Sequence, residues 1–385
     1  MTYRLFAVTL PGLEPCVQRE LTDLGFAPHA PKSADQSGEP SEEAGGLEFE
    51  TSLEGLFRAN LQLRCANRIL ARLGDFYAAA FSELRKKASR LPWEQYLRPG
   101  QPVAVRVTCR QSKLYHSDAV AERIAGAVGD KLGQPSALVK FDPETDRPAP
   151  LIVVRLVRDM CSVSIDTSGA LLHRRGYRLA AAKAPLRETL AAGLLLSAGW
   201  NPAAPLLDPF CGSGTIAIEA ARLTRRIAPG VQRRYAFMSW KTFDQNLWHQ
   251  TYTQAAQLQT ADCPPIIASD RDEGAVQSAQ ANAERAGVLE NIRFSTRAFS
   301  AVEPPPGPGW VITNPPYGVR VQTSRDLRDL YAALGNVLRR SCPGWQYGIL
   351  SSSPELIHQT RLQIDSELPL LNGGLPVRFY TGRIS

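Results

Sequence analysis

From residue 171 onward, short apolar segments alternate with amphipathic ones, and this alternation restricts the fold more than any other feature of the chain. Repeated strand-then-helix order predicts a parallel sheet, because parallel strands need crossovers and the crossover helices cover both sheet faces. We therefore expect an α/β, doubly wound domain over residues 169–385. The expected strands are Leu206–Asp208, Ile266–Asp270, Ile292–Phe294, Trp310–Thr313 and Gln346–Ser351, with helices at Thr215–Leu223, Ala275–Ala286 and Asp326–Leu338.

The N-terminal half has a different pattern, which predicts α+β architecture in two parts. Residues 1–57 show a β-α-β order that fits a ferredoxin-like segment, and residues 58–168 form a second α+β domain. The segment Ala30–Gly46, rich in Pro, Gly, Ser and Glu, is interpreted as an exposed loop. The expected strands are Arg4–Leu10, Gly46–Thr51, Pro102–Cys109, Leu151–Leu156 and Met160–Ile165, with helices at 13–24, Leu53–Leu73 and Ser117–Leu132.

Composition excludes several classes of protein. The 385 residues are 44% hydrophobic and 21% charged, as in an ordinary globular protein. The longest apolar run, Leu190–Trp200, is about half of the roughly 20 residues that a membrane-spanning helix needs, and the N-terminus has no signal-peptide pattern. Seven scattered cysteines without a CxxC pair, and histidines without HxxxH spacing, predict neither disulfides nor a metal site. We expect a cytoplasmic protein that neither associates with a membrane nor binds a metal ion.

The first motif with a chemical meaning is Leu206-Leu-Asp-Pro-Phe-Cys-Gly-Ser-Gly-Thr215. An apolar strand ends in the carboxylate of Asp208, and Gly212 and Gly214 allow the backbone of the following turn to approach a ligand closely. The motif is not a phosphate-binding Walker loop, because it lacks the GxxxxGK[ST] pattern. It predicts a ligand site at the carboxyl end of this strand.

The second motif is Ile266-Ile-Ala-Ser-Asp-Arg-Asp272, where the next apolar strand also ends in a carboxylate. An acidic side chain at this point commonly accepts both hydroxyls of a ribose, which makes Asp270 the candidate, whereas Asp272 suits a helix N-cap. Asp270 lies much farther from Asp208 than the roughly 20 residues of a minimal βαβ unit. We therefore expect an insertion between them, supplied by the basic and aromatic stretch Arg222–Trp248.

The third motif is Val311-Ile-Thr-Asn-Pro-Pro-Tyr317, a strand that ends in an amide, two prolines and an aromatic ring. Pro315 and Pro316 fix φ and remove two backbone donors, which leaves carbonyl oxygens free to accept, and Asn314 adds a side-chain acceptor. Such acceptors suit a planar exocyclic amino group, and Tyr317 can stack on the base that carries it.

Taken together, Asp-Pro-Phe-Cys-Gly-Ser-Gly-Thr, Asp270 and Asn-Pro-Pro-Tyr resemble the class I S-adenosylmethionine-dependent methyltransferases that act on exocyclic amino groups. The stretch from Tyr115 to Ile124 is similar to a THUMP domain, an RNA-binding module. The junction segments Asp166–Arg178 and Lys183–Ala191 resemble bacterial THUMP-containing guanine-N2 methyltransferases of large-subunit ribosomal RNA. The resemblance covers the whole chain and implies a Rossmann-like methyltransferase domain preceded by a ferredoxin-like segment and a THUMP domain.

The resemblance implies roles for the matching residues. Asp208, Gly212 and Gly214 would hold the methionine part of S-adenosylmethionine, and Asp270 its ribose. At the position where the family usually has an Asp contacting adenine, this chain has Arg297-Ala298, which leaves a backbone contact at Ala298. The implied cofactor-binding residues are Asp208, Phe210, Cys211, Gly212, Gly214, Thr215, Asp270, Arg271 and Ala298, and the implied catalytic residues are Asn314, Pro315, Pro316 and Tyr317.

The preferred hypothesis is guanine-N2 methylation of 23S rRNA, with catalysis by positioning and electrostatics on a base flipped out of its stack. Three alternatives remain: the same reaction on tRNA, adenine-N6 methylation of DNA, and a non-catalytic RNA-binding ribosome-assembly factor. The RNA partner would contact the basic stretch Arg58–Lys113 and a second basic cluster, through phosphate contacts. That cluster consists of Arg174, Arg175, Arg178, Lys183 and Arg187.

Overall fold

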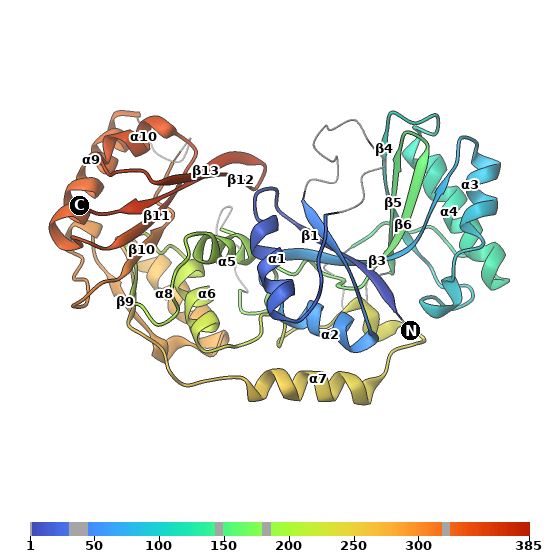
Figure 1. Ribbon diagram of the computed structural model, residues 1–385, viewed down its shortest axis with the longest axis horizontal. Coiled ribbons are helices and arrows are strands. Elements are labelled where there is room, and N and C mark those ends of the chain that lie inside the picture. Colours follow the sequence, from blue (N-terminus) through green and yellow to red (C-terminus); the bar gives the residue numbers. More distant parts are fainter. Residues whose placement is uncertain (1, 31–44, 143–148, 179–185, 318–323) are drawn as a thin grey trace. The chain divides into compact units, whose positions relative to one another are not determined.

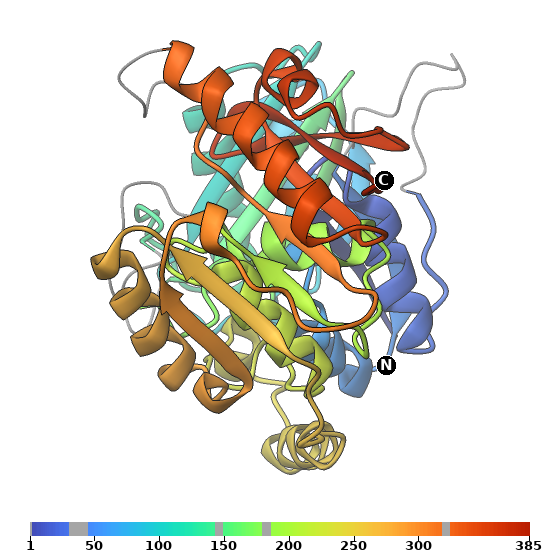
Figure 2. The ribbon, with the colours of Figure 1, turned by 90° about the vertical axis from the view of Figure 1, so that its left-hand side faces the viewer.

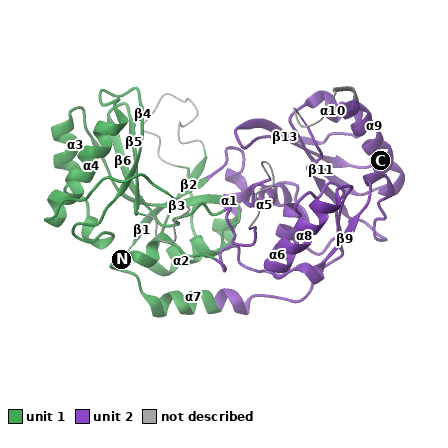
Figure 3. Cartoon of the chain, turned by 180° about the vertical axis from the view of Figure 1, so that it is seen from behind, with its two compact units in different colours: residues 1–8, 20–172, 233–253 green, residues 9–19, 173–232, 254–385 purple. Residues whose placement is uncertain are grey.

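Two β-sheets organise the part of the chain that the computed structural model describes, which comprises residues 2–30, 45–142, 149–178, 186–317 and 324–385 (Figures 1 and 2). The chain divides into two compact units (Figure 3). Most of the expected loop at 30–46, and Lys183, lie outside the described residues. Unit 1 comprises residues 1–8, 20–172 and 233–253, and unit 2 comprises residues 9–19, 173–232 and 254–385.

Unit 1 contains a six-stranded sheet of order β2-β1-β3-β6-β5-β4. Strands β1 and β2, β3 and β6, and β5 and β6 pair antiparallel, whereas β4 and β5 are parallel. The β5–β6 turn lies at Arg158-Asp159, as expected, and both residues have positive φ. The strands are β1 (Tyr3–Thr9), β2 (Gly46–Thr51), β3 (Ala66–Tyr77), β4 (Ala104–Arg110), β5 (Leu151–Val157) and β6 (Met160–Asp166).

The helices of this part of the chain confirm one sequence expectation and correct another. Helix α4 spans Ser117–Leu132 as predicted. The predicted helix Leu53–Leu73 is wrong in its second half, because α2 ends at Gln62 and β3 follows. The backbone of Leu63 is extended, and β3 is a central strand in which pairing on both sides outweighs helical periodicity. The remaining helices are α1 (Glu14–Asp23), α2 (Leu53–Gln62) and α3 (Phe81–Ala88).

Residues 233–253 leave the methyltransferase-like part of the sequence and belong to unit 1. They overlap the insertion expected at Arg222–Trp248, whose first part, 222–232, belongs to unit 2, and they include most of α7 (Gln245–Gln257). Aromatic rings hold the insertion against α2: Phe57 lies 4.7 Å from Phe237 and 5.6 Å from Trp248, between ring centroids. Tyr235, Phe237 and Trp240 of the insertion are buried and therefore belong to the core of unit 1, whereas Tyr252 is exposed.

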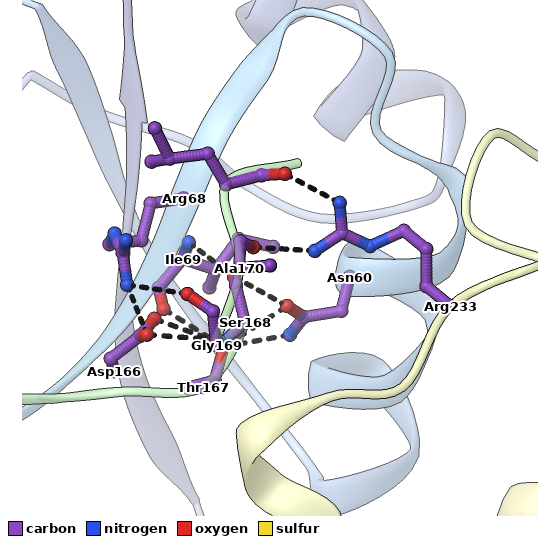
Figure 4. Close-up of polar contacts among 10 residues, drawn as sticks. Asn60, Arg68, Ile69, Asp166, Thr167, Ser168, Gly169, Ala170 and Arg233 are labelled. Atoms are coloured by element: carbon purple, nitrogen blue, oxygen red, sulfur yellow. Dashed lines mark hydrogen bonds and ion pairs between the residues drawn. The ribbon is translucent and has the colours of Figure 1, made fainter. Parts of the chain in front are cut away.

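The segment after β6 closes unit 1 with a buried polar network (Figure 4). Asp166 forms an ion pair with Arg68 and accepts the backbone N–H groups of Ser168 and Gly169, each at 2.9 Å. Asn60 of α2 donates to the hydroxyl of Thr167 at 2.8 Å. The carboxylate of Asp166 and the side-chain amide of Asn60 are thus matched by partners, as buried polar groups require.

Arg233, the first residue of the segment 233–253, joins the same network. Its guanidinium donates to the carbonyl oxygens of Ala170 and Leu171, at 2.5 and 2.6 Å. This segment is therefore fixed at its first residue by charge-assisted hydrogen bonds and along its length by aromatic packing.

Unit 2 contains a seven-stranded sheet of order β12-β13-β11-β10-β7-β8-β9. Five strands are parallel, and β13 is antiparallel to both β11 and β12. The five parallel strands match the five predicted ones, whereas the β12–β13 hairpin was not expected from the sequence. The strands are β7 (Leu206–Asp208), β8 (Ile266–Asp270), β9 (Ile292–Thr296), β10 (Trp310–Thr313), β11 (Gln346–Ser351), β12 (Ser366–Asn372) and β13 (Leu375–Arg383).

Helices cover both faces of this sheet. On one face α6 packs against β7 and β8, and α8 against β8 and β9. On the other, α9 buries Tyr331 and Leu334 in a core shared with Leu207, Val311 and Tyr347 of the strands (Figure 2). The doubly wound prediction is confirmed. The helices are α5 (Glu188–Ser197), α6 (Thr215–Thr224), α8 (Glu273–Arg285), α9 (Ser324–Ser341) and α10 (Pro354–Gln359).

Candidate active site

The three motifs meet at one edge of the unit 2 sheet. Strands β8, β7 and β10 are neighbours and parallel, with Leu207 opposite Ile267 on one side and Val311 on the other. Their carboxyl ends therefore carry Asp270, Asp208 and Asn314 to the same edge. In doubly wound sheets this edge is where ligands bind.

The turn after β7 brings backbone N–H groups to this edge. The N–H of Gly212 donates to Oδ2 of Asp270 at 2.9 Å, and the N–H of Cys211 donates to the carbonyl of Ser269 at 2.9 Å. Gly212 and Gly214 have φ of +50° and +82°, in the left-handed region that favours glycine. The turn from β7 is thus fixed to the end of β8.

The two glycines face different surroundings. A Cβ added to Gly214, the N-cap of α6, would lie 2.9 Å from Cβ of Ala279, so Gly214 allows α6 and α8 to pack closely. A Cβ on Gly212 would meet no heavy atom of the described residues within 4 Å. The backbone at Gly212 is therefore accessible to a ligand.

Asp208 is buried at the centre of the edge, 1% exposed. Its Oδ1 accepts the hydroxyl of Thr313 at 2.6 Å and the N–H of Phe210 at 3.3 Å. Burial raises the pKa of Asp208 to about 7, and the charge of Asp270 adds to the rise, while the two hydrogen bonds oppose it. A cation placed beside this carboxyl would favour its ionised form.

Phe210, Cys211 and Thr215, the other predicted residues of the first motif, each contact or are buried by the surrounding protein. Phe210 stacks on Phe299, with 5.1 Å between ring centroids. Cys211 is buried, and burial raises the pKa of its thiol, which keeps it protonated and unreactive. The hydroxyl of Thr215 accepts a hydrogen bond from Arg178 at 2.5 Å.

Asp270 is partly exposed, and its second oxygen, Oδ1, accepts the N–H of Asp272 at 3.1 Å. Asp272 caps α8 through Ala275, as expected. Arg271 points to solvent as an exposed residue. The N–H of Arg297 donates to the carbonyl of Asp270 at 2.9 Å, which fixes the backbone before Ala298 beside the carboxylate.

Arg297 and Ala298 stand where the similar methyltransferases usually have an Asp that contacts adenine. The guanidinium of Arg297 lies 3.6 Å from Glu303 and donates to the carbonyl of Ala301 at 3.2 Å. Ala298 is exposed. The arginine side chain is thus engaged with the segment that follows it, and the backbone of Ala298 remains the polar feature at this point.

The Asn-Pro-Pro-Tyr motif follows β10 directly. Oδ1 of Asn314 is buried and has no hydrogen-bond partner within the described ranges, although an amide oxygen is a strong acceptor. Pro315 is buried, and Pro316 and Tyr317 are partly buried. An unmatched acceptor at the ligand-binding edge indicates a group that receives an external donor.

Two residues that sequence reasoning missed support this motif. Thr313 holds Asp208, and its position as the last strand residue before Asn314 could have indicated it. Nδ2 of Asn372 donates to the hydroxyl of Tyr317 at 2.9 Å. Asn372 comes from the hairpin that was not predicted, so no local signal pointed to it.

The predicted basic cluster needs a correction. Arg175 is 1% exposed and lies 3.6 Å from Glu219, and Arg178 lies 3.5 Å from Glu188. Both arginines are committed to buried ion pairs inside unit 2, because an unpaired buried charge is costly. Arg68, within the predicted stretch Arg58–Lys113, is likewise paired with Asp166. These three side chains are not part of an RNA-binding surface, whereas Arg174 is exposed.

Among the residues described, no helix is long and apolar enough to cross a bilayer. The same residues contain no group of three or more His, Cys, Asp or Glu side chains arranged to hold a metal ion.

The sheet order, the glycine turn and the three strand-end motifs define a Rossmann-like methyltransferase domain. Residues 175–379 match a family described as "RMKL-like, methyltransferase domain", and this chain belongs to that family. Residues 4–70 match an RlmL ferredoxin-like domain and residues 78–166 match a THUMP domain. The fold expected from the sequence is confirmed in all three parts.

Curated relatives match almost the whole chain. A protein of Synechocystis named "Putative RNA methyltransferase slr0064" is 34% identical, over 96% of this chain and 94% of its own length. The ribosomal RNA large subunit methyltransferase K/L of Methylococcus capsulatus is 36% identical over 99% of this chain. The match covers only 51% of that relative, so this chain spans about half the length of the K/L protein.

Solved structures show the same fold. The crystal structure of SMU.472 complexed with SAH is 29% identical, with a TM-score of 0.85, and covers 99% of this chain and 97% of its own. A structure from Listeria monocytogenes, titled as a predicted N6-adenine-specific DNA methylase, is 32% identical, with a TM-score of 0.87. That match covers 99% of this chain and 96% of the Listeria chain.

Proposed function

We propose that this protein transfers a methyl group from S-adenosylmethionine to the exocyclic N2 amine of a guanine in 23S rRNA, in the cytoplasm. The observation that carries the proposal is the buried, unmatched Oδ1 of Asn314, placed at the same sheet edge as Asp208 and Asp270. An amine has the N–H that this oxygen lacks, and two carboxylates beside an accessible glycine turn suit a nucleoside cofactor with a charged amino acid end.

The residues present fit the cofactor. The open space over Gly212 admits a ligand against the backbone, and the partly exposed carboxylate of Asp270 suits a ribose diol. The buried carboxyl of Asp208 suits the cationic methionine end, and the backbone at Ala298 suits the adenine. SMU.472, which shares the fold, is complexed with SAH. The cofactor-binding residues proposed are Asp208, Phe210, Cys211, Gly212, Gly214, Thr215, Asp270, Arg271 and Ala298.

The cofactor supplies a methyl group already activated on a sulfonium, so the protein's task is to present the amine. The lone pair of guanine N2 is delocalised into the ring and is a weak nucleophile. Hydrogen bonds accepted by Asn314 Oδ1 and the carbonyl of Pro315 would hold both amine protons and turn the lone pair toward the methyl group. Catalysis then rests on positioning and electrostatics, with Pro316 fixing the turn and Tyr317 stacking on the base.

RNA as the substrate is supported by the THUMP match at residues 78–166 and by the names of the curated relatives. We assign the ferredoxin-like segment to residues 1–57, the RNA-binding THUMP domain to 58–168 and the methyltransferase domain to 169–385. The target base must leave its stack to enter the site, so a single-stranded or loosely paired guanine would be methylated most readily.

The proposal is tested with labelled S-adenosylmethionine and two RNA pools, deproteinised 23S rRNA and bulk tRNA, both from a strain lacking this gene. The labelled nucleoside is identified by mass spectrometry. N2-methylguanosine in rRNA is the expected product. N2-methylguanosine in tRNA alone would move the substrate, and N6-methyladenosine in either pool would contradict the assigned amine. If naked RNA accepts no methyl group, ribosomal assembly particles are the next substrate, and failure with these as well would leave a non-catalytic RNA-binding role.

A further inference from the structure

The β12–β13 hairpin extends past the end of its neighbour β11. The last residue of β11, Ser351, lies opposite Arg378 of β13. Pairing of β12 with β13 continues beyond this point, through Leu370 with Val377 and on to Asn372 with Leu375. The tip of the hairpin therefore overhangs the edge of the sheet that carries Asn314.

The overhanging tip contacts the catalytic motif directly. Asn372, the last residue of β12, donates from Nδ2 to the hydroxyl of Tyr317 at 2.9 Å. The two residues are 55 positions apart in the chain, and both belong to unit 2. One amide of the hairpin thus reaches the aromatic ring that closes the Asn-Pro-Pro-Tyr motif.

The part of the hairpin next to β11 is closely packed, whereas Leu371 and Leu375 at the tip are exposed. Val377, Phe379 and Tyr380 of β13 are buried, each 2% exposed or less. The ring of Phe379 lies over Gly348 of β11, where a Cβ would come within 2.4 Å of it. Close packing of this kind leaves the buried part of β13 little freedom to move relative to β11, and the tip extends from this fixed part.

The ring of Tyr317 is held at its other end too. It packs, partly buried, against a core that includes Tyr331 of α9 and Val311 of β10. Its body is therefore set by the core, and its hydroxyl by Asn372. A ring fixed in this way presents a constant face for stacking, at no ordering cost when the base arrives.

We propose that Asn372 is a positioning residue of the methyltransferase, which orients Tyr317 for stacking on the flipped base. The inference rests on the proposed function. Asn372 does not touch the reacting atoms, and it acts through the hydroxyl of Tyr317. The hairpin is then a part of the active site that is contributed from the far end of the chain.

A double-mutant cycle tests the role. Asn372→Ala should lower kcat for methyl transfer about 3- to 10-fold, the range for loss of one hydrogen bond of ordinary net strength. The dissociation constant for S-adenosylmethionine, measured by calorimetry, should stay within about twofold, since the contact lies outside the cofactor residues. In a Tyr317→Phe background, which lacks the hydroxyl, Asn372→Ala should have little further effect on kcat.

The matched control is Glu367→Gln, at the exposed opposite end of β12, which should leave kcat unchanged. An equal loss of kcat from Asn372→Ala in both backgrounds, or a fall in thermal stability that accounts for the loss, would overturn the positioning role.

A second readout does not depend on activity. In protein labelled with ¹³Cζ-tyrosine, the Tyr317 resonance is identified by its disappearance in Tyr317→Phe. Asn372→Ala should shift this resonance, and Glu367→Gln should not. An unshifted resonance would mean that the contact is absent in solution and would overturn the proposal. Absence of methyl transfer by the unaltered protein would instead remove the proposed function, and the resonance distinguishes the two failures.

Discussion

The backbone N–H of Gly212 and the Oδ2 atom of Asp270 are joined by a hydrogen bond of 2.9 Å that spans 58 residues of sequence. It ties the turn after β7 to the end of β8, so the two halves of the proposed cofactor site are positioned by one another. Asp270 consequently has a structural partner and still keeps part of its carboxylate exposed.

Substitutions at Asp270 and Asp272, two residues apart, should have different effects: the first mainly on cofactor binding and the second mainly on stability. Asp270→Ala removes the proposed ribose acceptor and the partner of Gly212, and should weaken S-adenosylmethionine binding about 10- to 100-fold. Asp272→Ala removes the cap on Ala275 of α8, and should cost about 1 kcal/mol of stability. Calorimetry and urea unfolding measure the two effects. Equal loss of cofactor affinity in both variants would contradict the assignment of Asp270.

The two glycines of the turn offer a second matched pair. Gly214→Ala meets both a positive φ and the nearby Ala279 Cβ, and should lower the free energy of unfolding by about 2–3 kcal/mol. Gly212→Ala meets only the positive φ and should cost about 1 kcal/mol. Its methyl group would occupy the open space over the turn, so cofactor affinity should fall more than stability does. If Gly212→Ala binds the cofactor normally, the ligand does not lie against this turn.

Asp208 predicts a pH dependence of stability in the protein without cofactor. Its pKa of about 7 in the folded state lies above the value of about 3.9 for an exposed Asp. The unfolded chain therefore loses this proton first, and the contribution of Asp208 to stability falls as pH rises from about 4 to 7, then stays level. Urea unfolding at pH 5 and pH 8 should show this loss, and Asp208→Asn should make the difference between the two pH values smaller. An unchanged difference would mean that the folded protein does not hold Asp208 protonated.

Asn314 should affect turnover far more than binding. Asn314→Ala removes the unmatched acceptor, and we expect methyl transfer to fall about 100-fold or more, as for loss of one preorganised hydrogen-bonding group. Cofactor affinity should stay within a few fold, measured by calorimetry. Asn336→Ala, which changes an asparagine on α9 that accepts a hydrogen bond from Arg339, is the matched control. A large loss of cofactor affinity in Asn314→Ala would contradict the role assigned to this residue.

The sequence was sufficient to predict the five parallel strands, and the structure brings the three predicted motifs to one edge of their sheet. Each of β7, β8 and β10 is a short apolar run with a polar residue at or directly after its end. The strand pattern and the polar residues Asp208, Asp270 and Asn314 therefore indicate the same edge of the sheet. Strand β3 of unit 1 was wrongly predicted as the second half of a helix. Its apolar residues allow a helical reading after α2, and only pairing with strands distant in sequence decides for a strand.

The contribution of the hairpin could not be predicted from local pattern. In the sequence, Asn372 is one polar residue before a Gly-Gly turn. Its contact with Tyr317 depends on the register of β12 and β13, which places it beyond the end of β11. Likewise, Arg175 and Arg178 look like ordinary surface charges in the sequence, and only burial beside Glu219 and Glu188 shows that they are structural.

The exchange of segments between the two units has a consequence for synthesis of the protein. Unit 1 needs residues 233–253, and unit 2 needs residues 9–19. As the chain leaves the ribosome, unit 1 cannot be completed until its last aromatic segment has emerged, well after the start of unit 2. The N-terminal residues 9–19 must in turn wait for partners near the C-terminal end of the chain, where Gly12 lies against Leu370 of the hairpin. No uninterrupted stretch of the gene therefore encodes one whole unit without part of the other, and dissection at residue 172 would leave two incomplete fragments.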